Sequence, residues 1–336
     1  LNSQRQSSMA TSLSLPDLSR GARKDFGLKE DRFEFVRELQ KGGQGEVHVC
    51  RRVGTGNEYA VKIIHSRVIR RHPEHELFLR REIRCLRELQ HRNIVNLIAA
   101  FWEAGSCFIV LDLAREGDLS DRIDSCTGIG RDPLSSDCAA RYVMQQLLAA
   151  IGYMHQRRVI HRDLKLENVL ISSSIPAPAP AECLLYDVKV TDFGLSTWLD
   201  IDNESLTPVG TPQYFAPEVL QTDYDTMIDF FSLGVILYVM LCGNFPFHPS
   251  EPDSLVDSYS WECVCPEGKD MARRLLEKDP KQRLNHAQCL QHSWLRGQGQ
   301  HVPDISLVLE EADEDTPDVC DSPLAIVAAE QAGDSP

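Results

Sequence analysis

The string HRDLKLEN, at residues 161–168, is the stretch that decides the fold of this chain of 336 residues. It has an aspartate two residues before a lysine and five residues before an asparagine. Three further strings accompany it: YAVK at residues 59–62, DFG at 192–194 and APE at 216–218. Each string alone is short and therefore weak evidence. Their joint occurrence, in this order and at these spacings, is highly specific.

Together these strings resemble the eukaryotic protein serine/threonine kinase family, over about residues 33–295. Within that range, residues 229–235 resemble a further motif of the family, and residues 236–247 are most like the calcium/calmodulin-dependent kinase group. The resemblance implies an α+β fold of two lobes. The small N-terminal lobe is expected to hold a five-stranded antiparallel sheet and one helix, and the larger C-terminal lobe to be mainly helical. It also implies a buried ion pair between Glu218 and Arg283 in the larger lobe.

Composition divides the chain into three parts. Residues 1–30 are rich in Ser and poor in aromatic residues, which predicts a disordered segment. The kinase domain is expected over residues 31–296, with the N-terminal lobe at 31–112 and the C-terminal lobe at 115–296. Residues 297–336 hold ten acidic residues and neither Lys nor Arg, which predicts an acidic disordered tail.

Hydrophobic periodicity predicts the main elements inside the domain. Residues 31–52 alternate as a strand, a Gly-rich turn and a second strand would, and residues 74–90 carry apolar side chains at helical spacing. The Pro-, Ala- and Ser-rich stretch at residues 172–180 predicts a loop. Further helices are expected at residues 224–242, 268–278 and 285–290.

The catalytic roles follow from the resemblance. Phosphoryl transfer depends on positioning and on neutralising negative charge more than on covalent chemistry. Asp163 would accept the proton of the substrate hydroxyl or orient that hydroxyl, and Lys165 would neutralise the γ-phosphate of ATP. Asn168 and Asp192 would bind Mg²⁺, which prefers hard oxygen ligands. The implied cofactors are ATP and Mg²⁺.

The resemblance also assigns the residues that hold the phosphates of ATP. Lys62 would contact the α- and β-phosphates, and Glu82, twenty residues later, would pair with it. Glycines in the preceding loop let backbone N–H groups approach phosphate oxygens. Taken alone this loop is equally consistent with a plain hairpin turn, and Gln40 stands where the family has its first glycine. The loop residues assigned to nucleotide binding are Leu39, Gln40, Lys41, Gly42, Gly43, Gln44, Gly45, Glu46 and Val47.

The adenine would lie between apolar side chains of both lobes. The residues assigned to it are Val47, Ala60, Leu111, Asp112, Ala114 and Leu170. Leu111 would be the gatekeeper, and Asp112 and Ala114 would offer backbone hydrogen bonds. The apolar members of this set could also simply be core residues, and both roles can hold at once.

Two marks indicate the substrate. Lys165 and residues 210–216 resemble serine/threonine kinases rather than tyrosine kinases. Asp118 and Glu167 match the acidic positions with which basophilic relatives bind an Arg three residues before the phosphoacceptor, because a carboxylate and a guanidinium can form two hydrogen bonds. The alternative is that Asp118 only caps the helix that follows it.

The segment between DFG and APE is expected to carry an activating phosphosite at Thr207. Arg162, which precedes the catalytic aspartate, could pair with that phosphate and order the segment. Pro208 suits a proline-directed kinase that acts in trans, so an upstream activating kinase is one implied partner. The alternative is an unmodified Thr207 that forms only local hydrogen bonds.

Charge and cysteine content narrow the remaining possibilities. The net charge of −15 argues against nonspecific nucleic-acid binding, because phosphate backbones need Lys and Arg, although an acidic surface would attract basic protein substrates. The eleven cysteines form no C-x-x-C pair, so we expect free thiols in a reducing compartment. There is no apolar signal region and no apolar run long enough to span a bilayer. We therefore expect a monomer in the cytoplasm or nucleus, with protein substrates and no membrane partner.

The competing hypothesis is a pseudokinase scaffold, which has the fold but no turnover. The two hypotheses differ in whether Lys62, Asp163, Asn168 and Asp192 are all present, and all four are. A small-molecule kinase is disfavoured by the intact segment at residues 210–218, which resembles a platform for protein substrates.

Overall fold

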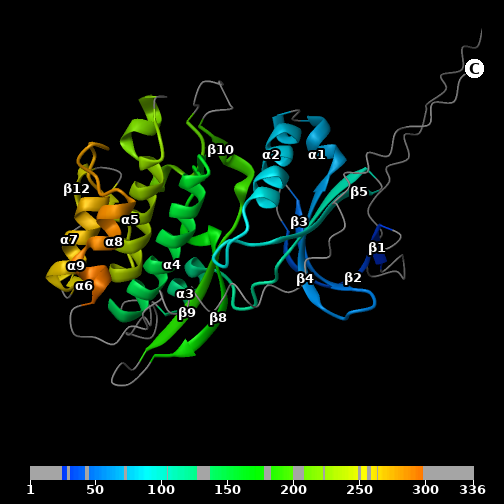
Figure 1. Ribbon diagram of the computed structural model, residues 1–336, viewed down its shortest axis with the longest axis horizontal. Coiled ribbons are helices and arrows are strands. Elements are labelled where there is room, and N and C mark those ends of the chain that lie inside the picture. The colour runs from blue at the N-terminus through cyan, green and yellow to red at the C-terminus, as the bar shows by residue number, and fades with distance from the viewer. Residues whose placement is uncertain are drawn as a thin grey trace, which may run out of the picture.

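A strand-rich N-terminal lobe and a mainly helical C-terminal lobe lie side by side in the computed structural model (Figure 1). This arrangement confirms the predicted two-lobed α+β fold. The structure describes residues 25–28, 31–41, 45–71, 74–103, 105–126, 137–177, 183–199, 208–221, 224–248, 251–255, 259–262 and 264–297. Among these residues, no helix combines the length and the apolar character needed to cross a membrane.

The N-terminal lobe is built on one antiparallel sheet with the strand order β1-β2-β3-β4-β6-β5. Its strands are β1 (Asp25–Leu28), β2 (Asp31–Lys41), β3 (Glu46–Arg52), β4 (Glu58–His65), β5 (Leu97–Glu103) and β6 (Ser106–Leu111). Side chains alternate between the two faces of a strand, and in β4 this sends Val61 and Ile63 into a buried cluster on the face opposite Lys62.

Strand β1 was not predicted from the sequence, which gave five strands and a disordered segment over residues 1–30. Phe26 supplies the physical reason, because its buried ring stacks on Phe35 with the ring centroids 4.3 Å apart. Gly27 has a φ of 113°, and a Cβ atom there would clash with the Asp31 carbonyl oxygen, so the tight connection from β1 to β2 needs glycine. The folded domain therefore begins earlier than the predicted boundary.

The helical part of the N-terminal lobe consists of α1 (Ser66–Arg71) and α2 (Glu74–Glu88), where the sequence had predicted one helix. Leu79 and Leu86 face the core from α2. Leu77, which also fits the helical spacing, is exposed. The buried stripe of α2 is therefore rotated slightly from the stripe that the apolar pattern suggests.

The C-terminal lobe is organised around α5, which is buried over nearly its whole length and circumference. Such a helix must be covered on every side, which explains its central position among the other helices in Figure 1. The helices of this lobe are α3 (Leu119–Cys126), α4 (Asp137–Gln156), α5 (Met227–Cys242), α6 (Tyr259–Glu262), α7 (Pro266–Leu275), α8 (His286–Gln291) and α9 (Ser293–Arg296). Its strands are β7 (Val159–Ile160), β8 (Val169–Pro176), β9 (Leu184–Val190), β10 (Thr197–Trp198), β11 (Phe247–His248) and β12 (Glu251–Leu255). Short 3₁₀ helices are η1 (Leu166–Asn168), η2 (Phe193–Leu195), η3 (Pro212–Tyr214) and η4 (Pro217–Gln221).

The β8–β9 hairpin corrects the loop predicted for residues 172–180, because β8 continues to Pro176. Asp187, on β9, explains why these polar residues form a strand. Its carboxylate accepts hydrogen bonds from Ser173 Oγ at 2.8 Å and from Tyr142 Oη at 2.8 Å, and its carbonyl accepts one from Ser172 Oγ at 3.0 Å. The sequence composition of the segment does not reveal a partner on another strand.

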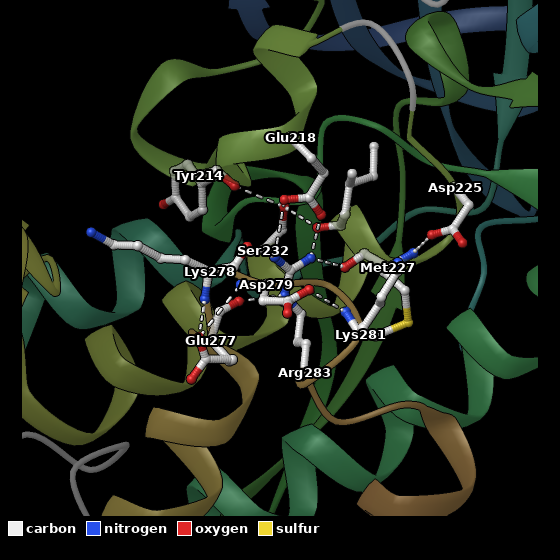
Figure 2. Close-up of polar contacts among 11 residues, drawn as sticks. Tyr214, Glu218, Asp225, Met227, Ser232, Glu277, Lys278, Asp279, Lys281 and Arg283 are labelled. Atoms are coloured by element: carbon white, nitrogen blue, oxygen red, sulfur yellow. Dashed lines mark hydrogen bonds and ion pairs between the residues drawn. The ribbon is translucent and has the colours of Figure 1, made fainter.

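The predicted ion pair between Glu218 and Arg283 is present and buried (Figure 2). The guanidinium binds both carboxylate oxygens, with Nη1–Oε1 at 2.5 Å and Nη2–Oε2 at 3.0 Å. Its other N–H groups donate to the carbonyl oxygens of Met227, Glu277 and Lys278 at 2.8, 2.9 and 3.3 Å. All five donors of the guanidinium are thus used, which connects η4, the start of α5 and the turn after α7.

The Arg283→Met substitution should lower the free energy of unfolding by about 3–5 kcal/mol, because it leaves the Glu218 carboxylate buried without its partner. Chemical denaturation of the full chain would measure this loss. The double substitution Glu218→Leu with Arg283→Met should lose less than the single one, since no buried charge then remains unpaired. A single variant as stable as the wild type would contradict this account.

Candidate active site

The loop at residues 161–168 is fixed in position by the buried carboxylate of Asp229, on α5. Asp229 accepts hydrogen bonds from the backbone N–H of His161 at 3.0 Å and of Arg162 at 3.1 Å, and lies 2.8 Å from His155 Nε2. Arg162 has a φ of 68°, a left-handed conformation that few residues other than glycine adopt. Burial alone would raise the pKa of Asp229, but the hydrogen bond and charge of His155 outweigh it and hold that pKa below its ordinary value.

Asp163 lies at the centre of a compact polar network. Its Oδ1 accepts a hydrogen bond from Thr211 Oγ1 at 2.8 Å, and its Oδ2 lies 3.0 Å from Lys165 Nζ. Lys165 also donates to Thr211 Oγ1 at 3.0 Å. The side-chain amide of Asn168 donates to the Asp163 carbonyl at 2.8 Å and to Oδ2 at 3.3 Å. The structure therefore brings the two predicted catalytic residues, Asp163 and Lys165, into direct contact.

The two predicted metal ligands, Asn168 and Asp192, lie at the ends of neighbouring segments. The N–H of Thr191 donates to the Asn168 carbonyl at 3.0 Å, which places Asp192 next to the loop of Asn168. The Asn168 amide nitrogen faces Asp163, so its Oδ1 oxygen points away from that aspartate. A carboxylate and an amide oxygen are hard donors, and this donor set fits Mg²⁺.

Lys62 connects the lobes through two carboxylates. Its Nζ lies 2.7 Å from Glu82 Oε1 on α2 and 3.2 Å from Asp192 Oδ1. Burial alone would lower the pKa of Lys62, but the carboxylates of Glu82 and Asp192 outweigh it and hold that pKa above its ordinary value. The same contact holds the pKa of Asp192 below its ordinary value. At neutral pH the site therefore contains a charged ammonium beside a charged aspartate.

The predicted adenine-binding residues share one face of the sheet. Val47 is the cross-strand partner of Lys62, and Ala60 is the partner of Leu111, while Ala60 and Lys62 are two residues apart on β4. Cross-strand partners and alternate residues lie on the same face, so all four side chains point to the same side. Leu170, on β8 of the other lobe, is half-buried and packs against the main core. These positions fit a nucleotide between the lobes.

The connection between the lobes offers backbone groups. The N–H of Asp112 donates to the Asn96 carbonyl at 3.1 Å, so the group that Asp112 can present to adenine is its own carbonyl. Its carboxylate instead binds Asn96 Nδ2 at 2.8 Å and Lys189 Nζ at 3.0 Å. Ala114 follows two residues later in the same irregular segment.

The phosphate loop is only partly described. Leu39, Gln40 and Lys41 form the exposed end of β2, and Gly42, Gly43 and Gln44 lie outside the described residues. Gly45 begins the return to β3, where a Cβ atom would clash with the Ile63 carbonyl oxygen. Glu46 is buried on the face of the sheet opposite Val47, which leaves only its backbone for a nucleotide.

A model of the protein kinase domain matches residues 33–295. The chain belongs to the protein kinase family. It is 34% identical over 286 residues to calcium-dependent protein kinase 8 of Arabidopsis thaliana, covering 82% of this chain and 51% of that protein. It is 35% identical over 280 residues to calcium/calmodulin-dependent protein kinase type IV of Mus musculus (80% and 55%), and 33% identical over 277 residues to the type II delta subunit of Oryctolagus cuniculus (79% and 49%).

These relatives confirm the predicted resemblance to the calcium/calmodulin-dependent group of protein kinases. The chain spans about half the length of the relatives that it matches. The match therefore concerns the protein kinase domain.

In this protein kinase domain, Asp118 caps the helix that follows it, as the alternative interpretation predicted. Its Oδ1 accepts a hydrogen bond from the backbone N–H of Asp121 in the first turn of α3, at 2.9 Å. Burial, and then the nearby charges of Asp121 and Glu167, raise the pKa of Asp118. Glu167 is exposed on η1. Asp118 and Glu167 thus form an acidic surface beside the catalytic loop, even though one oxygen of Asp118 is already in use.

The sequence did not identify Thr211 and Asp229 as site residues of the protein kinase. Both occur in strings that resemble the family, residues 210–216 and 229–235, and this resemblance was the signal that could have identified them. Thr207 lies outside the described residues. Arg162, expected to reach a phosphate there, donates from Nε to the Leu195 carbonyl at 2.5 Å and from Nη1 to Tyr224 Oη at 3.3 Å.

The Asp229→Asn substitution should destabilise this protein kinase by about 2–3 kcal/mol at neutral pH, because a neutral amide has one acceptor oxygen where the carboxylate has two. Since the folded-state pKa of Asp229 lies below its unfolded value, the contribution of its charge is complete above about pH 4 and is lost as the pH falls through the folded-state value. Urea denaturation of both proteins at a series of pH values should show the gap closing in acid. A gap that widens on acidification would refute the assignment.

Proposed function

We propose that this chain is an ATP-dependent protein serine/threonine kinase, which transfers the γ-phosphoryl group of ATP to hydroxyl groups of protein substrates. The observation that carries the proposal is that the contacts around Lys62 and the contacts around Asp163 are both formed in the same structure. Lys62 contacts both Glu82 and Asp192, while Asp163 contacts both Lys165 and Thr211. A nucleotide and a hydroxyl substrate could therefore meet with little rearrangement.

Each part of the site has a separate task in this proposal. The Lys62 ammonium would bind the phosphates and Asp163 would accept the hydrogen bond of the attacking hydroxyl. Lys165, 3.0 Å from Asp163, would offset the negative charge that develops on the transferred group. Asn168 and Asp192 would hold Mg²⁺, which when bound supplies further charge neutralisation on the phosphates.

The Asp163→Asn substitution should reduce turnover by about 10²–10⁴-fold, because an amide is a far weaker proton acceptor than a carboxylate. The measurement is phosphate transfer from ATP to an arrayed peptide library by the purified full chain. Asp124→Asn, an exposed aspartate on α3, is the matched control and should keep wild-type turnover.

Two outcomes of this assay would contradict the proposal. Wild-type turnover in Asp163→Asn would refute the role given to Asp163. No transfer by the wild type to any peptide or protein, with ATP bound, would favour the alternative of a pseudokinase scaffold.

We further propose a preference for Arg three residues before the phosphoacceptor, based on the acidic surface of Asp118 and Glu167. Burial is the main cause of the raised pKa of Asp118, and the charge of Glu167 adds a smaller contribution. A cation bound between the two carboxylates would relieve their electrostatic repulsion. Because Asp118 Oδ1 caps α3, its Oδ2 and the exposed Glu167 carboxylate are the groups that would take the guanidinium.

The Glu167→Gln substitution should raise KM about tenfold for peptides with this Arg, which corresponds to about 1.4 kcal/mol, and leave peptides without it unaffected. Steady-state kinetics on peptide pairs that differ only in the Arg would measure the effect. Glu116→Gln, a nearby exposed glutamate, is the control. The same selectivity in Glu167→Gln and the wild type would rule out this carboxylate as the Arg site.

A further inference from the structure

A second cluster of ionisable side chains lies on the N-terminal lobe, on the face of the sheet opposite the nucleotide. It consists of Glu46 and His48 on β3, His65 on β4 and Glu38 on β2, and we refer to it as the Glu46 cluster. Glu46, His48 and His65 are 7%, 2% and 7% exposed, whereas Glu38 is exposed. Glu38 is the cross-strand partner of His48, which puts them on one face. None of these side chains takes part in the site between the lobes.

The candidate ligand atoms of the Glu46 cluster lie close enough to one another to suggest a metal site. His48 Nε2 lies 3.2 Å from Glu46 Oε2, and one ligand atom from each of Glu38, Glu46 and His48 lies within 4.8 Å of the other two. Two ligands of a tetrahedral Zn²⁺ ion, each at about 2.0–2.1 Å, are separated by about 3.3 Å. The separation of Glu46 and His48 already matches this value, and the exposed Glu38 can approach by side-chain rotation.

His65 provides an independent observation, because one of its ring nitrogens faces the cluster without a hydrogen-bond partner among the described residues. Its side chain is more than nine-tenths buried, and within the described chain its Nε2 has no hydrogen-bond partner. That nitrogen lies 3.7 Å from Glu46 Oε1, so it faces the cluster. The same Glu46 oxygen contacts the ammonium of the exposed Lys41 at 2.9 Å. Buried polar atoms without partners are costly, and here one faces a carboxylate that already attracts a cation.

The donor types of the cluster indicate which cation would bind. A buried carboxylate beside a histidine is a donor pair that Zn²⁺ favours and that Mg²⁺, which prefers oxygen ligands and water, does not.

We propose that Glu38, Glu46 and His48 form a binding site for Zn²⁺, with solvent as the fourth ligand on the side of the exposed Glu38. His65 would contact the coordinated Glu46 carboxylate as an outer partner, after Lys41 has moved away from it. No acceptor faces His48 Nδ1 among the described residues, and an incomplete outer layer of this kind lowers metal affinity by about 10–100-fold. Because Glu38 lies before and Glu46 after residues 42–44, the ion would cross-link the two strands that carry the phosphate loop.

The test is metal uptake by the full chain after its metals have been removed with a chelator. Zn²⁺ binding would be measured by calorimetry, and Co²⁺ would serve as a visible probe of tetrahedral coordination. We expect the wild type to bind one ion at this site, and Glu38→Gln and His48→Gln to bind it at least about tenfold more weakly. Glu34→Gln, an exposed glutamate on the same strand, is the matched control and should bind like the wild type.

Two further comparisons separate this site from other metal-binding groups. Asp192→Asn should retain the ion, because it alters only the predicted magnesium site, and excess Mg²⁺ should not displace it. Glu38→Gln keeps the test valid even if His48→Gln folds poorly, since Glu38 is at the surface. Equal uptake by the wild type and Glu38→Gln would overturn the proposal. A Co²⁺ spectrum with thiolate charge-transfer bands would also overturn it, because the ion would then be bound by cysteines.

Discussion

The position of the catalytic loop depends on the buried Asp229 carboxylate. A left-handed backbone at a residue other than glycine costs about 1–3 kcal/mol, and Arg162 adopts one in the middle of the loop. The hydrogen bonds that Asp229 accepts from His161 and Arg162 offset this cost and select one loop conformation. Asp163 follows immediately, so its place in the loop depends on a residue from α5.

A second constraint joins the lobes to one another. Lys62 is on the sheet, Glu82 is on α2 and Asp192 precedes η2, so the ammonium ties three elements that could otherwise move independently. An aromatic contact acts in parallel, since the Arg84 guanidinium lies over the ring of Trp198 on β10, 4.2 Å from its centroid. The position of α2 is therefore coupled to the segment that follows DFG through both charge and packing.

The short strings predicted the fold, and they contain candidate site residues that the structure brings together, such as Asp163 and Lys165. The residues that orient them were harder to find. Thr211 contacts Asp163 from 48 positions away, and Asp229 contacts His161 from 68 positions away, so no local pattern reports either contact. Strand β1 was missed for a related reason, since its stability comes from packing of Phe26 against other strands and not from local composition.

The five hydrogen bonds of Arg283 also affect local unfolding of the C-terminal lobe. Two of the acceptor residues, Glu218 and Met227, lie 65 and 56 positions earlier in the chain, whereas Glu277 and Lys278 lie only 6 and 5 positions earlier. Local detachment of the turn after α7 would expose the interior of the lobe. It would also leave the Glu218 carboxylate without its partner among apolar residues. Such partial openings are therefore suppressed, and amide hydrogens in η4, α5 and α7 should exchange with solvent as one cooperative unit.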